Sequence, residues 1–479
     1  MTGGGPRAAR RPRRWAAALA IVSIIAAACG GPWIQVQNIG SEPAQVTVRY
    51  YDGNGDVVAD DARTLAPGES ARFSIGSNDR LPRGFRGSAV VESDQPVVAL
   101  RRTDAKGSTG EMSDGQAIPS TAGGGALYLP MFLRRGGPFH SWSSRAFIQN
   151  MGDTTACVTL TYLAANGGGG AREPRASTDR PDPGDCPKGG MALAPRATLY
   201  RDAEAAPLPD GFAGAIRVDL TANAQGTAPT GQLISASVDS YNDAFNLLTS
   251  YGGLRRSDLA TTVVLPLVER EVGPDGAYRT RFHVIGDASR SVQLQLHVEG
   301  VDGAGNPVVR DASTSFTGAL VCEQAADDAS NCLGGASLPP GFSGWARLTA
   351  TSPIGVVVQR GSYVADFGSY TGTAESSATR RLALPGVRPS SWLRVYVPGG
   401  GATSVRIRYI GPQIDGGSRT DSFPVSGVGT VRIDDVSSLP GGFDGGAILE
   451  SDAPIIVVAW LDVGGGGDHA LLYNGVPAG

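Results

Sequence analysis

The sequence is poor in the residues from which enzymes build catalytic centres and metal sites. Its 479 residues include 4 histidines, 5 cysteines and 5 methionines, and only 7% are aromatic. The patterns H-E-x-x-H, G-x-S-x-G and C-x-x-C do not occur, so the local signatures of zinc proteases, α/β-hydrolases and thiol or zinc sites are missing. We therefore expect no catalytic residues, no metal ligands and no cofactor, and we predict that the protein is not an enzyme.

Charge is also scarce, at 18% of residues, and lysine is almost absent. Lys106 and Lys188 are the only lysines among 41 basic residues, which face 45 acidic ones and give a formal net charge of −4. Binding to nucleic-acid phosphates requires clustered positive charge. A nucleic-acid partner is therefore not expected.

Glycine and proline, by contrast, are abundant, with 68 and 32 copies. Both weaken helix interiors, so a mostly helical protein is excluded. The hydrophobic fraction of 41% is high enough to form packed cores, unlike the low hydrophobicity typical of disordered chains. The composition predicts an all-β protein with many turns.

The N-terminus has the order of an export signal. Basic residues between Arg7 and Arg14 precede an apolar run from Trp15 to Ala28, in which Ser23 is the only polar residue. This run of 14 residues is shorter than the roughly 20 residues that a membrane-spanning helix needs. Basic, apolar and small residues in this order predict a signal peptide over residues 1–28.

The end of this run, Ala26-Ala27-Ala28-Cys29-Gly30, resembles the lipobox of bacterial lipoproteins. The resemblance implies cleavage before Cys29 and attachment of a diacylglyceryl group to its thiol. The protein would then be anchored extracytoplasmically, at the outer face of a bacterial membrane. Ala26 stands where that family favours Leu, and the three alanines also fit ordinary signal cleavage, which would release a secreted protein.

Four copies of one motif, L-P-x-G-F-x-G, divide the rest of the chain. Their phenylalanines are 127, 130 and 101 residues apart, which is the length of a domain and too long for solenoid repeats. We expect each phenylalanine to plug a core at a corner between two sheets, with the glycines at positive φ or in close contacts. The four phenylalanines are Phe85, Phe212, Phe342 and Phe443.

Short alternating strands surround each motif, as Val292, Leu294, Leu296 and Val298 illustrate with their period of two. Units after the first open with a Leu-Pro strand and end with Tyr-x-Gly. Roughly seven strands in each unit, broken by Gly and Pro turns, predict an immunoglobulin-like sandwich.

The repeats resemble the tandem immunoglobulin-like domains of exported bacterial surface proteins. We predict an all-β fold of four tandem immunoglobulin-like β-sandwich repeats after the signal peptide. The first repeat lacks a Leu-Pro strand and is a candidate for an incomplete sandwich. The predicted boundaries are residues 29–105, 126–258, 262–378 and 382–479.

The cysteines fit this division. Cys157 and Cys186 fall in one repeat and Cys322 and Cys332 in another. Pairing within repeats predicts two disulfides, which exported proteins can keep. Cys29 is then left over for the lipid.

Other candidate sites have plainer interpretations. Residues 52–56 read D-G-N-G-D like the start of a calcium loop, but Arg63 stands where such a loop ends in Glu, so a hairpin turn is favoured. The four histidines are expected at the surface, and His283 and His297 should face outward because they alternate with core residues. Packing is favoured over a sugar- or protein-binding platform for five tryptophans: Trp33, Trp142, Trp345, Trp392 and Trp460.

These features together predict a lipid-anchored, non-enzymatic cell-surface protein that acts in display, adhesion or scaffolding at the envelope. Its partners would be the membrane, through the lipid, and an unknown envelope protein or glycan. The alternative is a carbohydrate- or peptide-binding module of an envelope complex, or a secreted soluble protein if Cys29 is not lipidated.

Overall fold

The computed structural model places most of the chain in an almost entirely β fold. Among the described residues the longest α-helix is α1 (Ile433–Val436), so the predicted all-β class is confirmed. Cys29, His140 and His469 lie outside the described residues. The described residues are 17–25, 32–82, 85–106, 111–118, 125–137, 142–165, 186, 190–223, 233–273, 278–322, 332, 337–362, 366–462 and 470–478.

The strands form four successive units with closely similar strand patterns. Unit 1 contains β1 (Ala17–Ile25), β2 (Trp33–Asn38), β3 (Ala44–Asp52), β4 (Val57–Leu65), β5 (Ser70–Ser74), β6 (Arg86–Ser93), β7 (Val97–Lys106) and β8 (Glu111–Ile118). Unit 2 contains β9 (Ala126–Arg134), β10 (Ser143–Asn150), β11 (Ala156–Ala164), β12 (Met191–Leu193), β13 (Thr198–Asp202), β14 (Phe212–Asn223), β15 (Ile234–Asn242), β16 (Leu247–Gly252) and β17 (Leu254–Arg255).

The second half of the chain repeats the pattern, with short 3-10 helices at Arg256–Asp258, Glu375–Ser377 and Pro398–Gly400. Unit 3 contains β18 (Ala260–Val272), β19 (Tyr278–Ile285), β20 (Val292–Val301), β21 (Pro307–Phe316), β22 (Ala319–Cys322), β23 (Phe342–Gly361), β24 (Phe367–Thr371) and β25 (Thr373–Ala374). Unit 4 contains β26 (Thr379–Val387), β27 (Trp392–Tyr396), β28 (Ala402–Ile410), β29 (Ser418–Ser426), β30 (Val428–Arg432), β31 (Gly445–Asp462), β32 (Ala470–Asn474) and β33 (Val476–Pro477).

Each unit is a sandwich of two antiparallel sheets. The first sheet, which holds the first strand of the unit, has the order β4-β3-β6-β1 in unit 1 and β12-β11-β14-β9 in unit 2. The second sheet has the orders β5-β2-β7-β8 and β13-β10-β15-β16. In units 3 and 4 the long strands β23 and β31 run through both sheets. Units 1 and 2 thus have eight main strands each, one more than the seven of a constant-type immunoglobulin domain.

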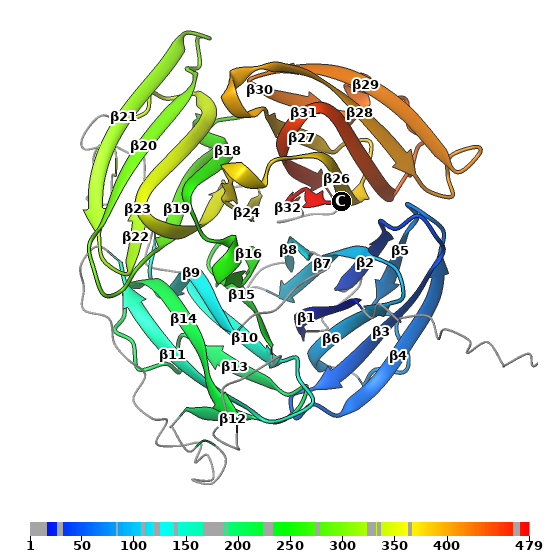
Figure 1. The fold of residues 1–479 in the computed structure, drawn as a ribbon, viewed down its shortest axis with the longest axis vertical. Helices are drawn as coiled ribbons and strands as arrows, with labels where there is room; N and C mark the ends of the chain where they lie inside the picture. The colour runs from blue at the N-terminus through cyan, green and yellow to red at the C-terminus, as the bar shows by residue number, and fades with distance from the viewer. Residues whose placement is uncertain are drawn as a thin grey trace, which may run out of the picture.

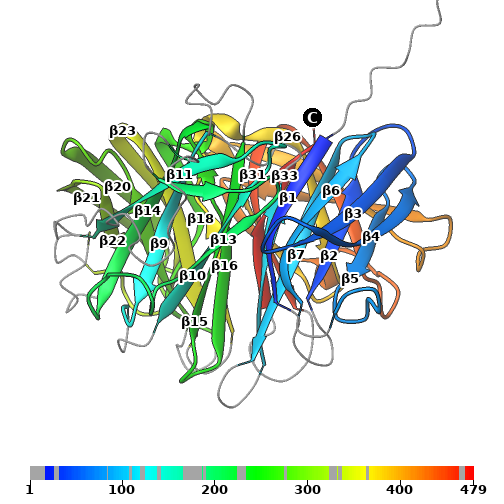
Figure 2. The same ribbon diagram turned by 90° about the horizontal axis from the view of Figure 1, so that it is seen from below.

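The four units close into a ring around a central axis (Figure 1). The last strands of the second sheets, β8, β16, β24 and β32, lie around this axis, and β8 contacts both β16 and β32. The last unit therefore packs against the first. Seen from the side in Figure 2, the strands of all units cross the thickness of the ring. The sequence predicts tandem sandwiches, and their closure into a ring is a finding of the structure.

Unit 1 extends beyond its predicted limits of residues 29–105. It ends with β8, and its first strand is β1, which comes from the apolar run of the predicted signal peptide. β1 pairs antiparallel with β6, from Ala17 opposite Ser93 to Ile25 opposite Arg86. β1 therefore occupies the position that β9, β18 and β26 occupy in the other units.

The L-P-x-G-F-x-G motif lies where the chain enters the first sheet. All four phenylalanines are buried, and Phe85 and Phe443 contact Tyr50 and Tyr409 edge to face. The last glycine of each motif faces a crowded space. A Cβ atom on Gly445 would lie 2.5 Å from the backbone oxygen of Ile410 and 2.7 Å from the Phe443 ring. The glycine therefore allows its own strand, the neighbouring strand and the phenylalanine side chain to approach closely.

A buried tyrosine secures the first strand in units 2, 3 and 4. Each of these strands breaks its register next to a Leu-Pro pair, which leaves a backbone oxygen outside the ladder. The tyrosine of Tyr-x-Gly donates its hydroxyl to the oxygen one residue after the proline. The pairs are Tyr251 with Met131, Tyr370 with Leu267 and Tyr473 with Gly386.

Substitution of the motif glycine tests this packing. We expect Gly445→Ala to lower the free energy of unfolding by about 1–3 kcal/mol, because its Cβ overpacks the corner. Gly441→Ala is the matched control, because nothing lies within 4 Å of its Cβ position. Urea unfolding of both variants measures the difference, and equal stability would contradict the close-approach role of Gly445.

Candidate functional site

The side chains that carry charge inside the protein gather at the junctions between units. The first strand of each unit packs against the second sheet of the next unit round the ring. β1 contacts β10 and β15, β9 contacts β19 and β23, β18 contacts β27 and β31, and β26 contacts β2 and β7. Each junction thus joins residues that are far apart in the sequence.

The junction between units 1 and 2 contains a buried ion pair. Arg101 on β7 donates from Nη2 to Oδ1 of Asp239 on β15 at 2.9 Å, and both side chains are at most 5% exposed. Ser250 on β16 donates to the same carboxylate oxygen at 2.5 Å and also contacts the guanidinium. Shared partners compensate for the cost of burying both charges.

The junction between units 3 and 4 holds a second buried pair inside an aromatic cluster. Arg360 on β23 donates from Nε to Oε2 of Glu269 on β18 at 2.8 Å. Its guanidinium lies 3.9 Å from the ring centroid of Tyr278 and 4.5 Å from that of Trp460, and Trp392 stacks on Trp460. Cation–π contacts of this kind favour the charged group. These tryptophans therefore pack around a cation that the chain itself supplies.

The junction between units 4 and 1 closes the ring. Asp444, from the fourth motif, forms ion pairs with Arg72 of unit 1 and Arg388 of unit 4. The Arg72 guanidinium also lies 4.3 Å from the ring centroid of the buried Trp33. Burial lowers the pKa of Arg72, and the charge of Asp444 opposes this shift.

The junction between units 2 and 3 is mostly apolar and corrects one prediction. Trp142 packs on Phe367 with ring centroids 4.8 Å apart, and Ser369 donates to the backbone oxygen of Ser250 at 2.9 Å. His283 is fully buried, although the sequence predicts that it faces outward. Its strand β19 does alternate, but β9 of unit 2 contacts this strand, so the face away from its own core is not free.

The environment of His283 disfavours the protonated ring. Both ring nitrogens lack a partner at normal hydrogen-bond geometry among the described residues. Burial lowers the pKa of His283 to about 3, with a further contribution from the charge of Arg281 and an opposing one from Gln359. His297 differs, because it is one-third exposed and its Nδ1 lies 2.8 Å from Oδ1 of Asp311.

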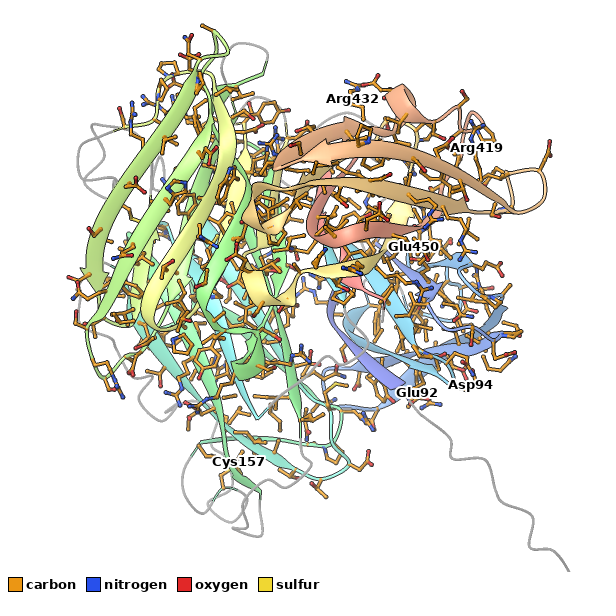
Figure 3. All side chains as sticks on the ribbon, turned by 45° about the horizontal axis from the view of Figure 1, so that its top comes forward. Glu92, Asp94, Cys157, Arg419, Arg432 and Glu450 are labelled. Atoms are coloured by element: carbon orange, nitrogen blue, oxygen red, sulfur yellow. A yellow bond between two sulfur atoms is a disulfide. The ribbon has the colours of Figure 1, made fainter. Side chains whose placement is uncertain are left out.

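The remaining sequence candidates have structural roles. The disulfides Cys157–Cys186 and Cys322–Cys332 are both present, with Cα atoms 5.7 Å and 5.2 Å apart, which confirms the predicted pairing. Cys157 lies in unit 2 on the outside of the ring (Figure 3).

Asp52 accepts hydrogen bonds from the backbone of Asn54 and Asp56, as in a hairpin turn. Of the tryptophans, Trp345 and Trp392 are half-buried and the other three candidates are buried.

Exposed charges lie at the rim of the units, whereas buried charges lie at the junctions between them. At the rim of unit 4, Arg419 and Arg432 pair with acids two residues away and are exposed (Figure 3).

The described residues contain no group of three metal-binding side chains, and none of their helices is long and apolar enough to cross a membrane. General acid–base chemistry needs a titratable group that reaches a substrate. The buried charges Arg101, Asp239 and Glu269 instead face partners within the ring.

Sequence reasoning missed these junction residues. Arg101 directly follows the apolar run Val97–Leu100 and lies in the middle of β7. A charged residue within an apolar strand indicates a buried charge, which needs a partner of opposite charge. The partner cannot be identified without the ring, because Asp239 lies 138 residues away.

The comparisons with known proteins give this chain a remote likeness to a solved structure. No family model matches the sequence, and no curated protein matches it. Among solved structures, the chain is similar at 13% identity to a tetra-tandem repeat in the extending region of a large adhesion protein. The alignment covers 92% of this chain and 93% of that chain, with a TM-score of 0.08. At this TM-score the likeness carries no argument about fold or function.

The buried pair at the junction of units 1 and 2 can be tested by removing one charge. We expect Asp239→Asn to lower the free energy of unfolding by about 3–5 kcal/mol, because Arg101 stays buried without its counter-charge. The control Asp219→Asn breaks the more exposed pair with Arg217 and should cost at most about 1 kcal/mol. Guanidinium unfolding curves give both values, and an equal loss would contradict a special role for the junction.

His283 predicts a dependence of stability on pH. Its folded-state pKa lies below the unfolded value of 6.5, so the unfolded chain binds the proton first. Stability that is present above pH 6.5 is therefore lost as the pH falls toward 3, with a slope of about 1.4 kcal/mol per pH unit from this group.

The matched variants separate His283 from the other titrating groups. His283→Gln should flatten the decline measured by urea unfolding between pH 6 and pH 4, whereas His297→Gln should leave the slope from His283 in place. An unchanged slope in His283→Gln would show that the buried ring does not cause the acid sensitivity.

Proposed function

We propose that the protein is exported, processed before Cys29 and held at the outer face of a bacterial membrane by a lipid on Cys29. There its ring acts as a non-enzymatic scaffold that binds envelope partners. The observation that carries this proposal is the pair of disulfides, Cys157–Cys186 and Cys322–Cys332. Disulfides persist in oxidising compartments outside the cytosol, and their pairing uses every cysteine except Cys29.

The ring supports a scaffolding role over a catalytic one. The ion pairs of Arg101 with Asp239 and of Arg72 with Asp444 join neighbouring units, so they hold these sandwiches in one arrangement. A rigid platform of this kind can position partners without reacting with them. The cation–π contacts of Arg360 argue against a sugar-binding platform at Trp392 and Trp460, because these rings already cover its guanidinium.

The lipid anchor is tested by a cysteine variant in a bacterial host that processes lipoproteins. We expect the parent protein to partition into the detergent phase of a membrane extract, and Cys29→Ala to lose this partition. The control is the double variant Cys322→Ser with Cys332→Ser, which removes one disulfide but leaves Cys29 intact. Continued membrane association of Cys29→Ala would contradict the anchor, and release into the medium of a parent protein without lipid mass would favour the secreted form.

A further inference from the structure

Removal of the signal peptide would take one strand out of the ring. We propose that processing opens a strand-acceptor groove along β6 of unit 1, and that this groove binds an extended apolar segment of another envelope protein. The inference rests on the proposed function, because it requires cleavage before Cys29. Without β1, the edge of β6 that faces β1 has no strand partner, and only β3 remains paired with β6.

The other units show what the groove requires. β9 is buried from Leu127 to Leu133, and β18 is buried over the seven residues from Val263 to Glu269. These strands are covered on both faces because one face meets the core of their own unit and the other meets the next unit. The position therefore accepts a strand with about seven consecutive apolar residues. A strand with one exposed face would instead alternate apolar and polar residues.

The walls of the groove keep contacts that do not involve β1. Gln149 on β10 donates to the hydroxyl of Ser88 on β6 at 2.6 Å, across the junction of units 1 and 2. Arg101 and Asp239 hold β7 against β15 at the same junction. On the unit 2 side, β10 contacts β1, and Phe147 on β10 is buried with its ring centroid 5.2 Å from that of Tyr200 on β13. Units 1 and 2 therefore remain joined when β1 is removed.

Unit 1 also lacks the tyrosine hydrogen bond that secures the first strand in units 2, 3 and 4. In units 2, 3 and 4 a buried tyrosine bonds the strand beside its Leu-Pro pair. Unit 1 has neither the Leu-Pro pair in β1 nor a tyrosine in β8. β1 pairs with β6 along its backbone, and strand addition combines such backbone pairing with pockets for alternate side chains. The position is therefore built for a strand that can be exchanged.

The segment that fits is defined by its chemistry. It is extended, about seven to nine residues long, apolar on both faces and free of internal proline, because each proline removes a donor from the ladder. It lies antiparallel to β6, as β1 does. A charged or glycine-rich peptide would leave the core of unit 1 uncovered and would bind much more weakly.

Hydrogen exchange of the processed chain tests the groove. The probe is a peptide of residues 17–25 with two added lysines at each end for solubility. The control peptide carries Leu19→Asp and Ile21→Asp, opposite the core residues Val91 and Ala89 of β6. The amides of β14, which is paired on both sides, provide an internal reference in the same sample.

In the processed chain we expect the β6 amides that face the β1 position to exchange at least about 100-fold faster than those of β14, because the strand that accepts their hydrogen bonds is gone. The β6 amides that bond to β3 should stay protected, because that pairing is kept. The probe peptide should slow the amides that face the β1 position by at least about tenfold at one peptide per chain, and the control peptide should not. Protection, without peptide, of the β6 amides that face the β1 position would overturn the groove. A dimer that the peptide dissociates would also overturn it, because the occupant would then be a second copy.

The mass of the N-terminus separates the two proposals. A chain that begins at Cys29 but whose β6 amides ignore the probe peptide would overturn the groove and leave the proposed function standing. A chain that retains residues 17–25 would contradict the proposed function and overturn the groove with it, because β1 would stay in place.

Discussion

The constraint on which this structure depends is that the first strand of every unit belongs to two units at once. It completes the first sheet of its own sandwich and covers the second sheet of the next. Apolar strands such as β9 and β18 are buried on both faces for this reason. A sandwich on its own would expose one of these faces, so each unit stabilises its neighbour and the series ends only when unit 4 meets unit 1.

The polar contacts at the junctions fix how neighbouring units are oriented relative to one another. Asp444 between Arg72 and Arg388, and Asp239 beside Arg101, are partly or fully withdrawn from water. A buried charge that loses its partner is costly, so units rotated or shifted against one another are disfavoured. Apolar burial thus drives closure of the ring, and the ion pairs select one geometry for it.

Local patterns in the sequence predict the local parts of the structure. Glycine and proline content predicts the all-β class. The cysteine positions predict both disulfides, because each disulfide joins two cysteines of the same unit. The motif glycines also act locally, since Gly445 meets Phe443 two residues away. The ring could not be predicted in this way. His283 shows why: strand alternation places it away from its own core, but only the ring covers that face with another unit.

Residues 17–25 fit two descriptions, and only one of them is visible without the whole ring. As a segment they have the order of an export signal, and as a strand they complete unit 1. Both descriptions use the same property, an uninterrupted apolar run, and the sequence alone gives no reason to expect the second. The two uses are compatible if export exchanges an internal strand for an external one.

Small-angle X-ray scattering of the processed chain distinguishes a closed ring of four sandwiches from an extended string. A compact ring of about 450 residues should have a radius of gyration of about 22 Å, the value expected for a compact chain of this length. Four sandwiches joined as an extended string would give roughly twice that radius. A value near 22 Å supports the closed ring, and one near twice that value would contradict it.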